Sequence, residues 1–229
     1  ATPLYAVNAP SNKELKIGIT QEFGSINPVI MSMSASSYIG QMVSRRLMVI
    51  DANWKWRCSL CTKVPSIKNG LAKILVEKGK KKLIVKWQLK PDYHWADGKP
   101  VTADDFKLAW EIGVSPNVSV SEKDQYTKIE SFTVDPMDPL KFETKFTSAV
   151  YDFYQLPYQA IPSHLEGPIW QKSKDKPDEY EKKSLYTVDA QNPGLYNGPY
   201  FIKEIKTGSH VELRRNPFFG DSIAHIEKV

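Results

Sequence analysis

The chain has 229 residues, of which 41% are hydrophobic and 25% are charged, and its formal net charge is +5. This balance excludes a wholly disordered or fibrous protein, and the length is sufficient for one or two folded domains. No apolar run approaches the ~20 residues that a membrane-spanning helix needs, since the longest run, Leu47 to Ile50, ends at Asp51.

The first predicted element is a half-buried strand over residues 13–20, where every second side chain is apolar. An irregular connection follows, because Gly24 and the pair Asn27–Pro28 disfavour regular structure. Residues 35–50 then carry apolar side chains at near-helical spacing, which predicts an amphipathic helix.

A lysine-rich run at residues 78–82 separates two apolar stretches. Residues 82–90 alternate between apolar and polar side chains and predict a long strand, with residues 71–77 as its hairpin partner. No aromatic side chains alternate with the lysines, so the run fits an exposed hairpin turn better than a nucleic-acid site.

A turn and a capped helix are predicted after this strand. Asp97–Gly98 is typical of a tight turn, and Thr102 is a favourable N-cap for the helix that follows. Val101 and Phe106 have the spacing of a hydrophobic staple across that cap. We interpret Asp104–Asp105 as charges that stabilise the first helical turn, in preference to a catalytic carboxylate pair.

The rest of the chain returns to strand pattern around one charged helical stretch. We predict strands at 129–135, 140–146, 198–205 and 210–215, and a helix at 168–184. Residues 223–229 have the pattern of a strand that has only begun. We therefore expect the sequence to be a fragment of a longer protein.

The sequence contains no phosphate-binding loop, nucleophile elbow, zinc-protease helix or calcium-binding loop, and its four histidines are dispersed. We therefore expect a protein that is not an enzyme and that holds no metal. Cys58 and Cys61 could form a redox pair, a plain disulfide or two unreactive thiols. Their surroundings resemble a loop and not a helix start, which favours the disulfide or the unreactive thiols.

Four blocks of sequence carry a family resemblance. Residues 87–106, WQLKPDYHWADGKPVTADDF, closely resemble the signature of the oligopeptide/dipeptide-binding family (family 5) of extracellular solute-binding proteins, the receptors of ABC importers. Residues 17–28, 162–164 and 197–217 are similar to three further blocks of that family, in the same order.

The resemblance implies a mixed α/β fold of the periplasmic-binding-protein type II kind. Residues 1–45 and 187–229 would form part of lobe I, and residues 46–186 would form an extra subdomain inserted in it. The C-terminal lobe would be absent from this chain. The implied function is to capture a solute, with an oligopeptide as the expected ligand, and to deliver it to a membrane permease.

The resemblance also implies where the ligand would bind, although Phe23 could equally be a core residue and Glu22 a solvated charge. Asn27 departs from the family pattern, which usually has Asp there. The carboxylate for a peptide amino terminus would come from the missing lobe. The expected ligand contacts are Glu22, Phe23, Gly24 and Ser25, followed by Tyr126 and Tyr200 as weaker candidates.

The expected partners are a peptide or small-molecule ligand and an ABC permease. We expect a monomer that needs no cofactor and binds no nucleic acid. The location implied is periplasmic or extracellular, with or without a lipid anchor, after removal of the signal peptide. Two alternatives stay open: an exported thiol-disulfide protein that uses Cys58 and Cys61, and a solute-sensing module that signals to a membrane partner.

Overall fold

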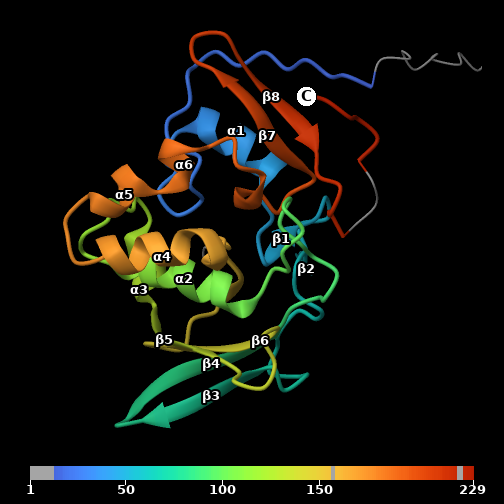
Figure 1. Ribbon diagram of the computed structural model, residues 1–229. Coiled ribbons are helices and arrows are strands. Elements are labelled where there is room, and N and C mark those ends of the chain that lie inside the picture. The colour runs from blue at the N-terminus through green and yellow to red at the C-terminus, as the bar shows by residue number, and fades with distance from the viewer. Residues whose placement is uncertain (1–12, 156–157, 221–223) are drawn as a thin grey trace, which may run out of the picture.

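The computed structural model describes residues 13–155, 158–220 and 224–229 (Figure 1). The α-helices are α1 (Ser34–Val43), α2 (Ala103–Val114), α3 (Lys123–Thr127), α4 (Ser163–Ser173), α5 (Glu179–Lys183) and α6 (Leu185–Val188). The strands are β1 (Met48–Ile50), β2 (Trp56–Cys58), β3 (Ala72–Glu77), β4 (Lys80–Gln88), β5 (Ile129–Val134), β6 (Lys141–Phe146), β7 (Tyr200–Lys206) and β8 (His210–Arg215). Two 3-10 turns, η1 (Phe153–Gln155) and η2 (Pro193–Leu195), complete the set.

A four-stranded antiparallel sheet with the order β3-β4-β6-β5 forms one end of the molecule, and the β7–β8 hairpin lies at the other end, with helices between them (Figure 1). The predicted strand pairs are confirmed at all three hairpins. The lysine-rich turn is confirmed as well, because Lys78 and Gly79 have φ values of 50° and 76° and both are exposed.

The first core lies between this sheet, α2 and the small β1–β2 pair. Leu83, Val85 and Trp87 alternate along β4 and are each at most 4% exposed, so one face of the strand is fully buried. Phe106 of α2 stacks on Phe142 of β6 at 5.6 Å between ring centroids. The alternation in the sequence therefore identifies this core correctly.

The second core lies between the helices and the β7–β8 hairpin. Ile39 and Val43 of α1, Ile112 of α2, Trp170 of α4 and Leu213 of β8 are among its members. Helices α4 and α5 contribute to it although they belong to the predicted inserted subdomain. The domain boundaries at 45/46 and 186/187 stay predictions, and the part of the expected lobe I before Lys13 lies outside the described residues.

Two predicted helices are shorter than their patterns suggested. The helix expected over 35–50 ends at Val43, because the backbone N–H of Arg45 donates instead to the Asn197 side chain at 2.8 Å and Leu47 donates to the carbonyl of Tyr158. The helix expected over 168–184 is two helices, α4 and α5, separated by a turn in which Asp178 has φ 56°. Tertiary contacts override local helical spacing at both places.

The prediction of a strand over 13–20 is wrong about its pairing. Among the described residues this segment has a single isolated bridge, from Glu14 to Lys228, and no ladder. Leu15, Ile17 and Ile19 are 45%, 53% and 44% exposed, so the apolar face is present but uncovered. The expected beginning of a strand near the C-terminus is confirmed at Lys228, which bridges Glu14 and Arg214; residue 223 lies outside the described residues.

No helix in the described parts of the chain combines the length and the apolar character that crossing a bilayer would need.

Candidate functional site

The loop after the N-terminal segment is held in place by short polar contacts. Glu22 accepts a hydrogen bond from the backbone N–H of Gly208 in the β7–β8 turn, at 3.0 Å. The N–H of Gly24 donates to the Ser36 hydroxyl at the start of α1, at 3.2 Å. The Ser25 hydroxyl accepts from the backbone N–H of Asn27 at 3.1 Å. The loop residues thus lie between the hairpin and α1 with their backbone fixed.

Asn27 anchors the end of this loop in the interior. Its side-chain oxygen accepts from the N–H of Val29 at 3.0 Å, and its amide donates to the Tyr180 hydroxyl at 3.2 Å and to the Ser184 hydroxyl at 3.5 Å. Asn27 is completely buried. An amide suits this position because it needs both a donor and an acceptor, which an ionised Asp could not supply.

Glu166 of α4 completes the buried polar group beneath the loop. One carboxylate oxygen accepts from the N–H of Leu185 at 2.8 Å, and the other is buried without a hydrogen-bond partner among the described residues. Burial raises the pKa of the Glu166 carboxyl, and the polar groups close to it, the Tyr180 hydroxyl first, offset this effect only in part.

The raised pKa of Glu166 predicts a specific pH dependence of stability. A folded state that binds the proton more tightly than the unfolded state loses stability as the pH rises above the ordinary value of 4.5. We therefore expect the free energy of unfolding of Glu166→Gln, relative to that of the unmodified chain, to increase when the pH is raised from 4.5 to 7.5. Urea unfolding of both proteins at the two pH values measures this difference. A difference that is constant, or that shifts toward the unmodified chain at pH 7.5, contradicts the prediction.

Two hollows flank the loop. One has a volume of about 900 Å³ and is lined by residues 17–26 together with the end of the β7–β8 hairpin and α6. Glu22, Phe23, Gly24 and Ser25 all line it, so the structure brings the four expected contacts together. Phe23 is only partly buried and packs against the second core.

The second hollow, of about 450 Å³, lies between α1 and the β1–β2 pair, and a smaller one of about 140 Å³ adjoins it. Pro28, Met31, Ser37, Arg46 and Gln159 line both, so the two form one continuous groove at the other end of the loop. Apolar side chains of β1 and β2 form the opposite wall. The sequence analysis did not identify this groove.

The groove contains two arginines that form no ion pair among the described residues, Arg45 and Arg46, and one acidic side chain, Glu122, lines its smaller hollow. In the described chain, Arg57, Arg214 and Arg215 pair with acidic side chains, whereas no ion pair forms at Arg45 or Arg46. The guanidinium of Arg45 lies 5.0 Å from the centroid of the Phe219 ring, and its Nε is buried without a hydrogen bond. Arg46 is exposed and faces the groove. The adjacent arginine pair in the sequence was the signal that could have revealed this site.

The two weaker candidate residues lie elsewhere. Tyr126 is 3% exposed, packs against Gly113 and touches the groove only at its smaller hollow. Burial raises the pKa of its phenol. The Tyr200 hydroxyl donates to the carbonyl of Ile226 at 3.1 Å, far along the hairpin from the loop. Both tyrosines have structural contacts, and their role as ligand contacts stays a prediction.

The comparisons with known proteins identify the family of the chain. Residues 66–229 match the family model described as bacterial extracellular solute-binding proteins, family 5. The chain belongs to this family. Family 5 proteins are solute-binding components of ABC transporters and are periplasmic or extracellular.

Three similar proteins show the extent of the likeness. A probable ABC transporter-binding protein of Deinococcus radiodurans is 27% identical over 56% of this chain and 22% of its own length. The oligopeptide-binding protein of Thermus thermophilus, solved with a pentapeptide, has a TM-score of 0.81 at 24% identity, over 96% of this chain and 41% of its own. NikZ of Campylobacter jejuni, solved with Ni(L-His), has a TM-score of 0.71 at 21% identity, over 95% and 38%.

The structural likeness shows that the family 5 chain has the mixed α/β fold of type II periplasmic binding proteins, as the sequence predicted. The chain spans between about a fifth and two fifths of the length of these relatives. The fold described here corresponds to part of the fold of the two solved structures.

The block that carries the family 5 signature has a structural role here. Thr102 and Asp105 form a reciprocal capping box at the start of α2, which confirms the predicted cap. The Asp97 carboxylate contacts the His164 imidazole of α4 at 2.9 Å.

Cys58 and Cys61 are joined in a disulfide that links β2 to the loop after it, and Cys61 is fully buried.

Proposed function

We propose that this chain forms one wall of the ligand-binding cleft of an ABC-importer receptor, and that the ligand is an oligopeptide. The observation that carries the proposal is the position of Glu22, Phe23, Gly24 and Ser25, which line one hollow on a chain that matches family 5. An extended peptide would bind there through main-chain hydrogen bonds, with its side chains in the adjoining hollows.

The groove at Arg46 suits an anionic group of the ligand. The pentapeptide of the Thermus protein and the L-His of NikZ both carry a carboxylate. A guanidinium without an acidic partner is a favourable donor to a carboxylate. We assign Arg46 to the carboxylate of the ligand, next to the apolar wall of β1 and β2.

The first experiment is mass spectrometry of the ligand released by denaturation from the full-length receptor. A set of short peptides of similar length supports the proposal. A single sugar or metal chelate would support the receptor function and show that the ligand is not a peptide. An empty protein favours the sensing module, which would bind a membrane partner without a permease.

Substitution of Arg46 tests the charge assignment in the full-length receptor. We expect Arg46→Ala to weaken binding of peptides with a free C-terminal carboxylate by about ten-fold, the effect of one charge-assisted hydrogen bond. Titration calorimetry with the same peptide as its C-terminal amide should show no comparable loss. The matched control is Arg57→Ala, since Arg57 is exposed and already paired with Asp51. Equal losses for acid and amide would contradict the assignment.

The thiol-disulfide alternative has less support. Cys58 and Cys61 are joined in a disulfide and Cys61 is 0% exposed, although Cys58 is only partly buried, and the chain belongs to a family of solute-binding proteins. We propose the periplasm or cell exterior as the location and an ABC permease as the partner.

A further inference from the structure

The β3–β4 hairpin carries the net positive charge of the chain. Residues 72–88 contain six lysines and one acidic residue, Glu77, so their formal charge is +5. The whole chain has the same formal charge, which means that the charges of all other residues cancel. The hairpin forms the outer edge of the four-stranded sheet, at the opposite end of the molecule from β7 and β8 (Figure 1). A charge concentrated at one end of a protein orients it toward an oppositely charged partner.

The single acidic residue leaves most of this charge uncompensated. The Glu77 carboxylate lies 2.8 Å from the Lys145 ammonium of β6 and 3.3 Å from the Lys82 ammonium of β4. Lys82 also pairs with Glu130. The five remaining lysines of the hairpin are exposed, and no ion pair to them is found within the described chain: Lys73, Lys78, Lys80, Lys81 and Lys86.

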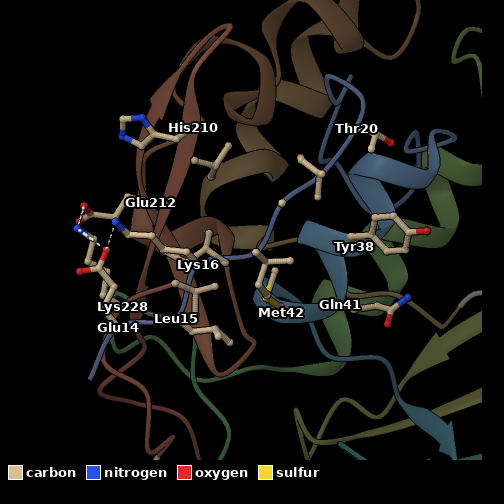
Figure 2. Close-up of a pocket in the computed structure, with 16 residues that line it drawn as sticks. Glu14, Leu15, Lys16, Thr20, Tyr38, Gln41, Met42, His210, Glu212 and Lys228 are labelled. Atoms are coloured by element: carbon tan, nitrogen blue, oxygen red, sulfur yellow. Dashed lines mark ion pairs between the residues drawn. The ribbon is translucent and has the colours of Figure 1, made fainter. Parts of the chain in front are cut away.

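The charges around the hollow at the other end of the molecule are paired. This hollow has a volume of about 930 Å³, lies between residues 14–20 and β8, and is lined by two lysines. The Lys228 ammonium lies 3.1 Å from the Glu212 carboxylate and 3.5 Å from that of Glu14, and these three residues gather at one end of the hollow (Figure 2). The second lysine, Lys16, lies 4.0 Å from Glu14. The unpaired lysines of the β3–β4 hairpin therefore have no counterpart around this hollow.

A tight turn fixes the lysines at the end of the hairpin. Lys78 and Gly79 both have positive φ, and Glu77 lies opposite Lys80, which is the geometry of a two-residue hairpin turn. The turn therefore holds three exposed ammonium groups close together at the free end of the hairpin. We use the name lysine tip for the set Lys73, Ile74, Val76, Lys78, Lys80 and Lys81.

Two exposed apolar side chains lie among these lysines. Ile74 and Val76 point to the same face of β3 and are 43% and 68% exposed. Ile74 pairs with Leu83 of β4, which is 4% exposed, whereas Val76 pairs with Lys81. The buried core thus ends between these two pairs, and the lysine tip extends beyond it into solvent. A surface of lysines and exposed apolar side chains matches a bilayer interface, where ammonium groups meet phosphates and apolar groups enter between the headgroups.

We infer that the lysine tip binds the anionic surface of a phospholipid bilayer. Its ammonium groups would contact lipid phosphates, and Ile74 and Val76 would enter the headgroup region. Family 5 proteins are periplasmic or extracellular, so a membrane surface lies close to them.

Three other partners fit the lysine tip less well. A single-stranded nucleic acid would need exposed aromatic side chains for stacking, and Trp87, the aromatic residue of the hairpin, is 2% exposed. A second copy would bring like charges together along the edge of β3. An acidic peptide would use the lysines but not Ile74 and Val76.

Attachment at the lysine tip leaves the candidate ligand site uncovered. The hollow lined by Glu22 lies beside the β7–β8 hairpin, at the opposite end of the molecule from the β3–β4 hairpin (Figure 1). Membrane binding is therefore independent of solute binding, and its failure would leave the proposed function intact.

Sedimentation with lipid vesicles tests this inference on the full-length receptor, produced without a lipid anchor. Vesicles of equimolar phosphatidylglycerol and phosphatidylcholine should bind the receptor, and vesicles of phosphatidylcholine alone should not. The triple variant Lys78→Gln, Lys80→Gln, Lys81→Gln should bind the anionic vesicles about 100-fold more weakly, the combined effect of three lysines close to an anionic surface.

The matched control removes the same charge from another part of the molecule. It replaces three exposed lysines for which the described chain shows no ion pair, Lys172 of α4 and Lys203 and Lys206 of β7, by Gln. Because salt screens charges that lie far from the vesicle, this control should bind within about two-fold of the unmodified receptor.

Replacement of Ile74 and Val76 by Thr tests the apolar contribution. Thr keeps the branching at Cβ that favours a strand, and thermal unfolding reports that the sheet is intact. This double variant should bind the anionic vesicles about ten-fold more weakly. Equal losses in the lysine variant and its control, equal binding to anionic and neutral vesicles, or no loss in the double variant overturns the inference. Binding to poly-L-glutamate without binding to the anionic vesicles would also overturn it, because the partner would then be an acidic protein.

Discussion

Replacement of Asp105 by Ala is expected to lower the free energy of unfolding by roughly 3–5 kcal/mol, because it leaves several buried donors without an acceptor. One carboxylate oxygen accepts from the N–H of Thr102 at 2.9 Å and from the indole of Trp95 at 3.0 Å. The other accepts from the N–H and hydroxyl of Ser163 at 2.8 and 2.6 Å. Asp105 is 2% exposed, so water cannot replace it.

The neighbouring carboxylate provides the control. Asp104 occupies the same first turn of α2 but is exposed, so Asp104→Ala should cost at most about 1 kcal/mol through the helix dipole. Urea unfolding followed by tryptophan fluorescence compares the two variants under one set of conditions. Equal losses for Asp104→Ala and Asp105→Ala would show that the four hydrogen bonds contribute nothing beyond the charge.

Asp105 also shows how far the sequence could predict this fold. Its place near Thr102 at a helix start was evident from local spacing, and the structure confirms the cap. Its contact with Ser163, 58 residues further along, has no local signal, and that contact joins α2 to α4. Strand pairs connected by short turns were predictable for the same reason, because their partners are close in sequence.

The candidate site was likewise predictable from the sequence only in part. The loop at residues 22–25 was found through its resemblance to a family block, and the structure places its residues together on one hollow. The groove at Arg46 was missed because Met31 and Gln159, which line it with Arg46, come from distant parts of the chain. The alternation over residues 13–20 predicted a strand, but the pattern could not reveal that this segment forms a single isolated bridge among the described residues.

A second substitution with a large expected effect concerns the backbone between the two parts of the second core. The N–H of Gly198 donates to the carbonyl of Val43 at 2.8 Å, at the point where α1 ends. A Cβ atom at Gly198 would lie 2.4 Å from the carbonyl carbon of Val43 and 2.6 Å from the nitrogen of Ser44. These are backbone atoms, so no side-chain rotation can relieve the contact. The glycine at position 198 is thus required by close packing of two backbones.

We therefore expect Gly198→Ala to lower the free energy of unfolding by roughly 2–3 kcal/mol, the upper part of the range for overpacking in a core. The end of α1 must move away from the hairpin, and because Arg46 follows that end by three residues, the groove should change shape with it. The matched control is Gly18→Ala, since a Cβ there would meet no atom within 4 Å. Thermal unfolding of both variants, with peptide titration of the full-length receptor, measures the two effects. A Gly198→Ala variant as stable as Gly18→Ala would show that α1 and the hairpin are not held at this distance. A Gly198→Ala variant with normal stability but altered peptide binding would also contradict the prediction, because the same displacement of α1 should produce both changes.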